Sequence, residues 1–187
     1  VYYVDKIECK NGELDTPYFY AGTKRESAME FPASNSELKN YAETGGYYYE
    51  GRTSIRLNSN GTITVWNPVS DTFETRPLPS NGVIYVNEKS GGSSNRFDKK
   101  AGNVFVSGTL KGRLTIGASN NIYITDFDPT RENLSSATET NGVTYATTDF
   151  SFNNENKEFD VTGTGEDMLG LIANNNVVIL TQGWFNN

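Results

Sequence analysis

Short apolar segments recur at a nearly regular interval in the second half of the chain. In each of the four, two aliphatic residues flank a middle residue, which is aromatic in three of them, and the middle residues fall 20, 10 and 8 positions apart. Repeated short strands at such spacing are typical of stacked coils. The segments are Ile84–Val86, Val104–Val106, Leu114–Ile116 and Ile122–Ile124.

This repetition predicts an all-β fold, namely a right-handed β-solenoid that is parallel β-helix-like. The right-handed sense follows from strand twist and from the usual hand of parallel crossovers. Turns at intervals of roughly 8–12 residues also occur in other all-β folds, so a β-sandwich or barrel is the alternative.

Residues 53–66 predict a tight antiparallel β-hairpin. Thr53–Leu57 and Thr62–Trp66 both alternate between polar and apolar residues, which is typical of strands with one buried face. Asn60-Gly61 stands between them and supplies the positive φ angles that tight hairpin turns require.

One short helix is predicted within residues 32–46. Ser34 followed by Glu37 matches a capping box, in which each side chain bonds to the backbone N–H of the other residue. Gly45-Gly46 ends the helical pattern. We expect the apolar face of this helix to pack on the β core.

We expect a single β-rich domain over residues 1–187. Residues 1–66 would supply N-terminal strands, the short helix and the hairpin, and residues 81–187 would supply the solenoid coils. Residues 67–80 hold three of the six prolines and are predicted to be a connector. A loop excursion from the coils is predicted at residues 126–167, and such loops often carry specificity.

Three further predictions concern a loop, a corner and the end of the coil region. Glu88–Lys100 has no hydrophobic pattern and is predicted to be a surface loop. Asn174–Asn176 is predicted to form a corner in which side-chain amides satisfy exposed backbone groups. Trp184 and Phe185 are expected to cover the last coil, because an open strand edge favours aggregation.

The overall charge and the missing residue types exclude several classes of partner and of catalytic site. A net charge of −7 and a pI near 4.7 argue against nucleic acid and anionic membrane surfaces as partners, because their phosphates repel an acidic surface. The sequence has no histidine and a single cysteine, Cys9, which excludes Ser-His-Asp triads and His-ligated zinc. No apolar run approaches the roughly 20 residues of a spanning helix, so we expect no membrane insertion by this segment.

Aromatic residues are the first candidates for a binding site. Tyr47, Tyr48, Tyr49 and Trp66 lie on strands expected to be neighbours, and aromatic faces stack on sugar rings. Because alternate residues of a strand face opposite ways, Tyr47 and Tyr49 should share a face that Tyr48 does not. The alternative is that all four rings are ordinary core and half-buried sheet residues.

Acidic residues of the 126–167 excursion are the second candidates. Asp126, Asp128 and Asp167 could supply the oxygen ligands that Ca²⁺ prefers, although the sequence contains no EF-hand loop. Asp126 and Asp128 together with Arg131 invite comparison with polysaccharide lyases, in which acidic residues hold Ca²⁺ and a basic side chain abstracts a proton. Paired carboxylates could alternatively catalyse glycoside hydrolysis. Since these acids lie in one irregular loop, we predict no catalytic residues, no enzyme activity and no required cofactor.

Two motifs resemble a known family. Gly108–Ile116 reads G-x-L-x-G-x-L-T-I and Asp167–Ala173 reads D-M-L-G-L-I-A. Within residues 31–180, the chain resembles the β-solenoid domain of bacterial surface proteins associated with type IV pili, the PilX-like minor pilins and pilin-like competence factors. The resemblance implies a solenoid fold and a location at the bacterial surface, and its motifs imply no catalysis. Such proteins begin with a hydrophobic pilin helix, which does not open this sequence, so we expect a trimmed domain or a relative with the solenoid alone.

These observations together predict a non-enzymatic, extracellular structural or adhesive domain of a bacterial surface or type IV pilus-associated protein. Its partners would be pilus or cell-surface proteins. One alternative is a carbohydrate-binding adhesin module, whose partner would be a polysaccharide. Two others are a self-assembling filament subunit with exposed strand edges and, least favoured, a polysaccharide-active β-helix enzyme.

Overall fold

The described elements belong to two units of the chain, Val1–Ala33 and Ser34–Asn187. In the first unit of this computed structural model, β1 (Tyr2–Tyr3) pairs in parallel with β2 (Lys24–Arg25). All other elements lie in the second unit. The structure describes residues 2–3, 24–25, 35–130, 140–153, 155, 158–163 and 165–181.

The described part of the second unit is mostly β-structure with one short helix, which confirms the predicted all-β class. All four repeated apolar segments form strands, β7 to β10. The elements are α1 (Ser36–Gly45), β3 (Tyr47–Glu50), β4 (Thr53–Asn58), β5 (Thr62–Asn67), β6 (Thr72–Pro77), β7 (Val83–Asn87), β8 (Val104–Leu110), β9 (Arg113–Ala118), β10 (Ile122–Thr125), β11 (Val143–Tyr145), β12 (Thr148–Asn153), β13 (Glu158–Gly163), β14 (Met168–Ala173) and β15 (Val177–Leu180).

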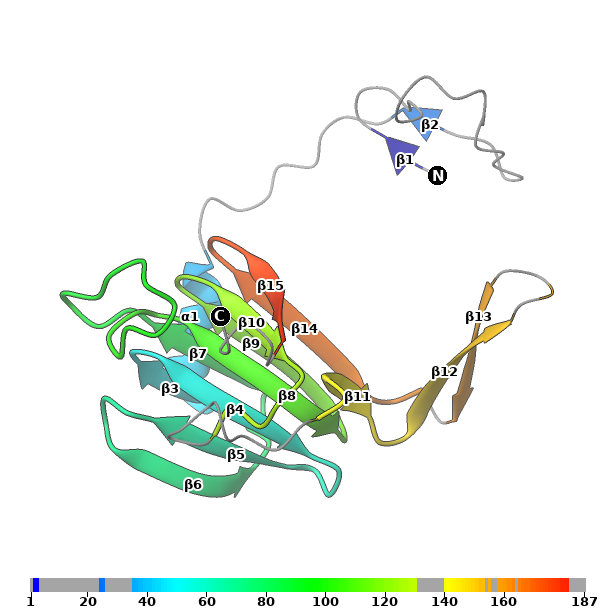
Figure 1. Cartoon of the computed structure of the whole chain (residues 1–187), viewed down its shortest axis with the longest axis horizontal. Helices are drawn as coiled ribbons and strands as arrows, with labels where there is room; N and C mark the ends of the chain where they lie inside the picture. Colours follow the sequence, from blue (N-terminus) through cyan, green and yellow to red (C-terminus); the bar gives the residue numbers. More distant parts are fainter. Residues whose placement is uncertain are drawn as a thin grey trace. The chain divides into compact units, whose positions relative to one another are not determined.

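Most of these strands form two large sheets (Figure 1). The four-stranded sheet has the order β14-β9-β7-β3, and all its pairs are parallel. The seven-stranded sheet has the order β15-β10-β8-β4-β5-β6, with β11 paired to β8. The chain alternates between the sheets, so β3/β4, β7/β8, β9/β10 and β14/β15 form successive levels, which we call rungs one to four.

A closed solenoid is not seen among the described residues. Equivalent strands of successive rungs stack in parallel within each sheet, but β4, β5 and β6 pair antiparallel and make the larger sheet mixed. The structure therefore gives no support to the predicted right-handed winding.

The main hydrophobic core combines residues of both sheets. Equivalent apolar residues of successive rungs are paired in register, as in the row of Ile84, Ile116 and Leu171. Ile84 and Ile116 are fully buried. Because side chains alternate along a strand, Phe105 and Tyr123 point to the other face of the larger sheet, where their rings stack with centroids 4.9 Å apart.

The β4–β5 hairpin is confirmed, but the predicted connector at residues 67–80 is wrong. Gly61 takes a φ of +84° in the hairpin turn, whereas Asn60 does not have a positive φ. The supposed connector contains β6, which pairs antiparallel with β5 over its whole length. Pro77 is compatible with this strand because β6 is at the sheet edge, where one side of the backbone needs no ladder hydrogen bond.

Helix α1 is confirmed, whereas Ser34 of the predicted capping box lies outside the described residues. The N-cap is Asn35, which makes no side-chain cap hydrogen bond. Its side chain instead accepts a hydrogen bond from the Tyr85 hydroxyl at 2.7 Å and donates to the Ala118 carbonyl at 3.3 Å, so tertiary contacts take the place of the cap. The helix also packs closely on the sheet, since a Cβ built at Gly117 would lie 2.5 Å from Leu38 Cδ2.

Asparagine side chains connect the corners of rungs two to four. Asn103 Oδ1 accepts a hydrogen bond from the backbone N–H of Asn121 at 3.1 Å, and Asn121 Oδ1 accepts one from the backbone N–H of Asn176 at 3.2 Å. We call these three residues the Asn ladder. Asparagine amides therefore satisfy backbone groups at the corners, as predicted, but the amides that do so belong to Asn103 and Asn121, while Asn175 and Asn176 donate to side-chain oxygens of the neighbouring rung.

The excursion after β10 carries three of the strands. β11 extends the larger sheet beside β8, whereas β12 and β13 form a separate antiparallel pair. Trp184 and Phe185, which were expected to cover the last coil, lie outside the described residues. No helix in the described part of the chain has the length and apolar character to cross a membrane.

Candidate functional site

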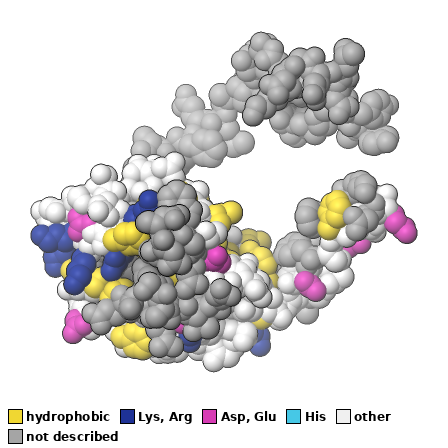
Figure 2. Space-filling model, in the orientation of Figure 1, with side chains coloured by type: hydrophobic (Ala, Val, Ile, Leu, Met, Phe, Trp, Pro, Cys, Tyr) yellow, Lys and Arg dark blue, Asp and Glu magenta, His cyan; other side chains and the backbone are white. Residues whose placement is uncertain are grey.

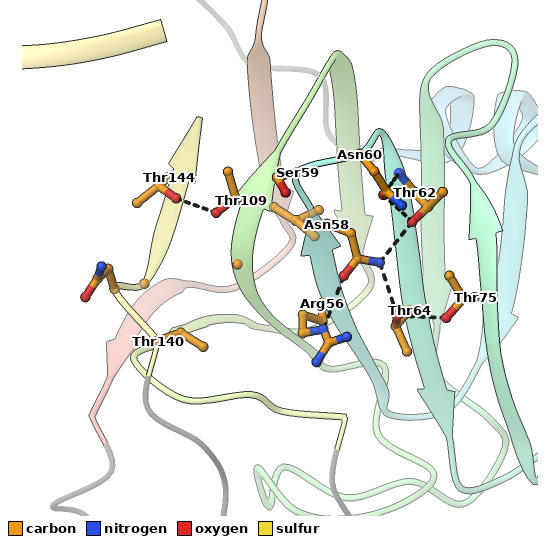
Figure 3. A pocket seen from close by; sticks show the side chains of 14 residues that line it. Arg56, Asn58, Ser59, Asn60, Thr62, Thr64, Thr75, Thr109, Thr140 and Thr144 are labelled. Carbon is orange, nitrogen blue, oxygen red and sulfur yellow. Dashed lines mark hydrogen bonds between the residues drawn. The ribbon is translucent and has the colours of Figure 1, made fainter. Parts of the chain in front are cut away.

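A polar hollow of about 620 Å³ lies at the β4–β5 turn, against the loop that precedes β11 (Figure 3). Most of its lining side chains carry hydroxyl or amide groups, and the described residues that line it include no aromatic ring and no carboxylate. Six threonines contribute to the lining. They are Thr62, Thr64, Thr75, Thr109, Thr140 and Thr144.

One wall of the hollow is a hydrogen-bond network across β4, β5 and β6. Arg56 Nε donates to Asn58 Oδ1 at 3.2 Å. The amide nitrogen of Asn58 donates to the hydroxyls of Thr62 at 3.0 Å and Thr64 at 3.2 Å. The Thr64 and Thr75 hydroxyls lie 2.9 Å apart across the β5–β6 pair. The network holds these groups in fixed positions, because strand pairing sets the spacing of the side chains.

The opposite wall is formed where β11 joins β8. The hydroxyls of Thr109 and Thr144 lie 2.9 Å apart across this parallel pair. Gly108 is the first residue of β8 that pairs with β11. It has a φ of +99°, and its N–H donates to the Gly142 carbonyl at 2.8 Å. A side chain at Gly108 would collide with the Leu57 backbone, so only glycine allows β4 and β8 to meet here.

Arg56 is held at the hollow by an ion pair with Asp128. Its Nη1 lies 2.8 Å from Asp128 Oδ2, and the carboxylate also accepts hydrogen bonds from the backbone and side chain of Thr130. Burial disfavours the charged carboxylate, but the Thr130 hydrogen bonds and the Arg56 charge outweigh burial and hold the pKa of Asp128 below its ordinary value. Arg131, compared above with a lyase base, lies outside the described residues.

These groups can bind a ligand that is rich in hydroxyls. Threonine hydroxyls donate and accept, the asparagine amides do both, and Arg56 donates. Among the described lining residues Arg56 is the single charged one, and its charge is balanced by Asp128. The hollow therefore suits neutral polar recognition better than acid–base chemistry.

Tyr47 and Tyr49 lie together beside Arg76, as strand alternation predicts. The guanidinium carbon of Arg76 is 3.5 Å from the Tyr47 ring centroid, and Arg76 Nη1 is 3.5 Å from the Tyr49 hydroxyl oxygen. Burial raises the pKa of the Tyr49 hydroxyl. Both rings therefore contribute to one end of the core.

Tyr48 and Trp66 lie on different sheets. Tyr48 stacks on Tyr85 with ring centroids 6.5 Å apart, and Lys39 Nζ lies 5.4 Å from the Tyr48 ring centroid. Trp66 is on β5 of the larger sheet, with the guanidinium of Arg52 at 5.3 Å from its ring. The four predicted aromatic residues are thus not brought together into one platform, and none of them lines the hollow.

The three predicted calcium ligands are not brought together either, since the described residues contain no group of three or more potential metal ligands. Asp167 binds protein groups: Oδ1 accepts from the Gly112 N–H at 2.7 Å, and Oδ2 accepts from the N–H and hydroxyl of Thr147, both at 2.6 Å. Burial opposes ionisation of Asp167, but these hydrogen bonds outweigh it and lower its pKa. Asp128 is paired with Arg56, so two of the three carboxylates fasten the excursion to the rungs.

Charged side chains are distributed unevenly. Basic side chains gather on the side where the loop between β7 and β8 lies (Figure 2). That loop holds four basic residues, and the described part of the β12–β13 hairpin holds four acidic ones. They are Lys89, Arg96, Lys99 and Lys100 in the loop and Asp149, Glu155, Glu158 and Asp160 in the hairpin.

Sequence reasoning missed the hollow. The one local signal was the spacing of Thr62 and Thr64, which places two hydroxyls on strand β5. Their partners come from other strands, for example Thr75 on β6 and Asn58 on β4. A set of polar residues from separate segments cannot be recognised before the strand pairing is known.

Comparisons of the chain with protein-family models, with curated proteins and with solved structures gave no match. The resemblance to pilus-associated solenoid domains therefore rests on the two sequence motifs, Gly108–Ile116 and Asp167–Ala173.

Proposed function

We propose that this chain is a non-enzymatic, extracellular structural and adhesive domain of a bacterial surface or type IV pilus-associated protein, built as a β-solenoid. The observation that carries the proposal is the parallel stacking of the rungs, with apolar rows in register and the Asn ladder at their corners. Stacked strands of this kind form a rigid support on which long loops can be presented.

The excursion between β10 and β14 is the part we propose to contact a partner. It is fastened at one end by the Arg56–Asp128 ion pair and at the other by Asp167, which binds Gly112 and Thr147. Between these points it carries the separate β12–β13 hairpin. Loops positioned by a rigid scaffold commonly carry binding function, and the partners would be pilus or cell-surface proteins.

Localisation in the bacterium that encodes the chain tests this proposal. Antibodies raised against the purified chain would be used on intact cells, on the sheared surface fraction and on cytosol. We expect labelling of intact cells and recovery of the protein in the sheared fraction. Recovery in the cytosol alone would contradict the proposal.

Carbohydrate binding is a second candidate function, favoured by the hollow. Its rigid hydroxyls and amides match the donors and acceptors of a sugar, since each can pair with a sugar hydroxyl. Glycoside hydrolysis uses two carboxyl groups near the scissile bond, and no carboxylate is among the described residues that line the hollow. This supports binding without hydrolysis.

A depletion assay tests the second candidate. The chain would be mixed with cellulose, chitin, xylan, pectin and peptidoglycan, and both bound protein and released sugar would be measured. We expect binding without sugar release, and we expect Thr75→Val with Thr144→Val, on opposite walls, to weaken it at least about tenfold. Thr115→Val, outside the hollow, is the matched control. If Tyr48→Ala or Trp66→Ala removes binding instead, an aromatic site is responsible, and released sugar would show an enzyme.

A further inference from the structure

The two ends of the stack of rungs differ in how their strand edges are protected. At the rung-one end, the β5–β6 hairpin extends the larger sheet beyond β4 (Figure 1). The edge strand β6 carries the Glu74–Arg76 ion pair and Pro77. Arg76 also covers the ring of Tyr47 on β3. Charges and proline on an edge strand are the usual protection against pairing with another chain.

The rung-four end has no such protection in the described part of the chain. Among the described strands, β14 and β15 each end a sheet and pair on one side, with β9 and β10 respectively. Neither strand contains a charged residue or a proline. Large apolar side chains are exposed along both strands: Met168 (62%), Ile172 (45%), Val177 (47%), Val178 (38%) and Ile179 (76%).

We propose that this end binds a second copy of the chain, so that the protein is a closed, twofold-symmetric dimer. The surface that a partner must contact consists of two neutral strand edges, β14 of one sheet and β15 of the other, with the end of the apolar core between them. The second copy presents the same two edges at its own rung-four end, while at its rung-one end the larger sheet ends in the protected strand β6 and Arg76 of β6 covers Tyr47 of β3. Pairing of like ends around a twofold axis continues both sheets across the contact, and it uses the unprotected rung-four edges of both copies, so growth beyond a dimer is not expected at that end.

Charge directs a second copy to this end in preference to the rest of the surface. Two copies that each carry a net charge of −7 repel each other over most of their surfaces. The rung-four strands are neutral, so contact there brings no charged side chains of β14 or β15 together. Antiparallel pairing of an edge strand with its own symmetry mate needs no complementary charge pattern, only two matching rows of backbone groups.

The test is sedimentation equilibrium of the full chain over a range of concentrations up to about 0.5 mM, which detects even weak dimers. We expect a mass that approaches twice the 20.7 kDa of one chain. Ile172→Lys with Ile179→Lys places charges on both exposed edges and should raise the dimer dissociation constant at least about tenfold. Phe73→Lys on β6, a residue 66% exposed, is the matched control and should leave the dimer unchanged. Circular dichroism would show that both variants are folded.

Several outcomes would overturn the proposal. A wild-type chain that is monomeric throughout, or a dimer that survives the double lysine variant, would exclude rung-four pairing. Assemblies that grow beyond a dimer would show that the rung-one end also pairs. If removal of residues 182–187 converts a monomeric chain into a dimer, those residues, and not a second copy, occupy this end.

Discussion

The Asn ladder can be tested at Asn103, whose side chain is fully buried. Its Oδ1 accepts the backbone N–H of Asn121 at 3.1 Å, and its Nδ2 donates to the Arg96 carbonyl at 3.3 Å. Asn103→Ala removes these two hydrogen bonds, together with a longer one that Oδ1 accepts from Asn121 Nδ2 at 3.5 Å, and leaves their partners without them. A neutral hydrogen bond contributes about 1 kcal/mol net to stability, and loss of a bond that leaves a buried donor or acceptor unsatisfied costs about 1–3 kcal/mol. With Asn121 only partly buried, we expect the free energy of unfolding to fall by about 2–4 kcal/mol.

Urea unfolding followed by circular dichroism measures this loss, and a midpoint shift with an unchanged slope would show that stability alone has changed. Asn175→Ala is the matched control, because Asn175 is exposed and, among the described residues, its amide donates to the Asn120 side chain in the neighbouring rung. We expect that variant to lose less than about 0.5 kcal/mol. A loss below about 1 kcal/mol for Asn103→Ala, or equal losses for both variants, would refute a stabilising role for the buried part of the ladder.

Three further predictions concern packing and the ends of the excursion. Gly117→Ala should lower the free energy of unfolding by about 1–3 kcal/mol in thermal melts, because the new Cβ meets Leu38, and an unchanged melting temperature would contradict the helix packing. Asp128 has a lowered pKa, so its contribution to stability is present above its unfolded pKa of about 3.9 and is lost as the pH falls through the folded value. Asp128→Asn should therefore be less stable than wild type at pH 7 by about 1–3 kcal/mol. This difference in the free energy of unfolding should shrink as the pH is lowered. A difference that does not change with pH would show that the Arg56–Asp128 pair does not stabilise the fold. Asp167→Ala should speed proteolytic cleavage within residues 140–165, measured by mass spectrometry, while cleavage at the wild-type rate would show that this carboxylate does not fasten the excursion.

Local periodicity was enough to locate the strands of the rungs. Val104–Val106 and Ile122–Ile124 were correctly predicted because two aliphatic residues on one face and an aromatic residue on the other can be read within three positions. The Asn60-Gly61 turn was equally local, since its positive φ requirement is a property of the residues themselves. The N-cap residue Asn35 makes no side-chain cap hydrogen bond because its side chain is bonded to Tyr85, a contact that sequence spacing does not contain.

The sequence by itself therefore determined the all-β class, the hairpin, the short helix and the exclusion of histidine chemistry. Only the tertiary structure decided that β6 pairs with β5, that Asp128 is paired with Arg56, and that Tyr48 and Trp66 lie on separate sheets. The polar hollow and the unprotected rung-four end also belong to this second group. The physical reason is that alternation sets which way a side chain points, whereas contacts between distant segments depend on which strands pair and in which register.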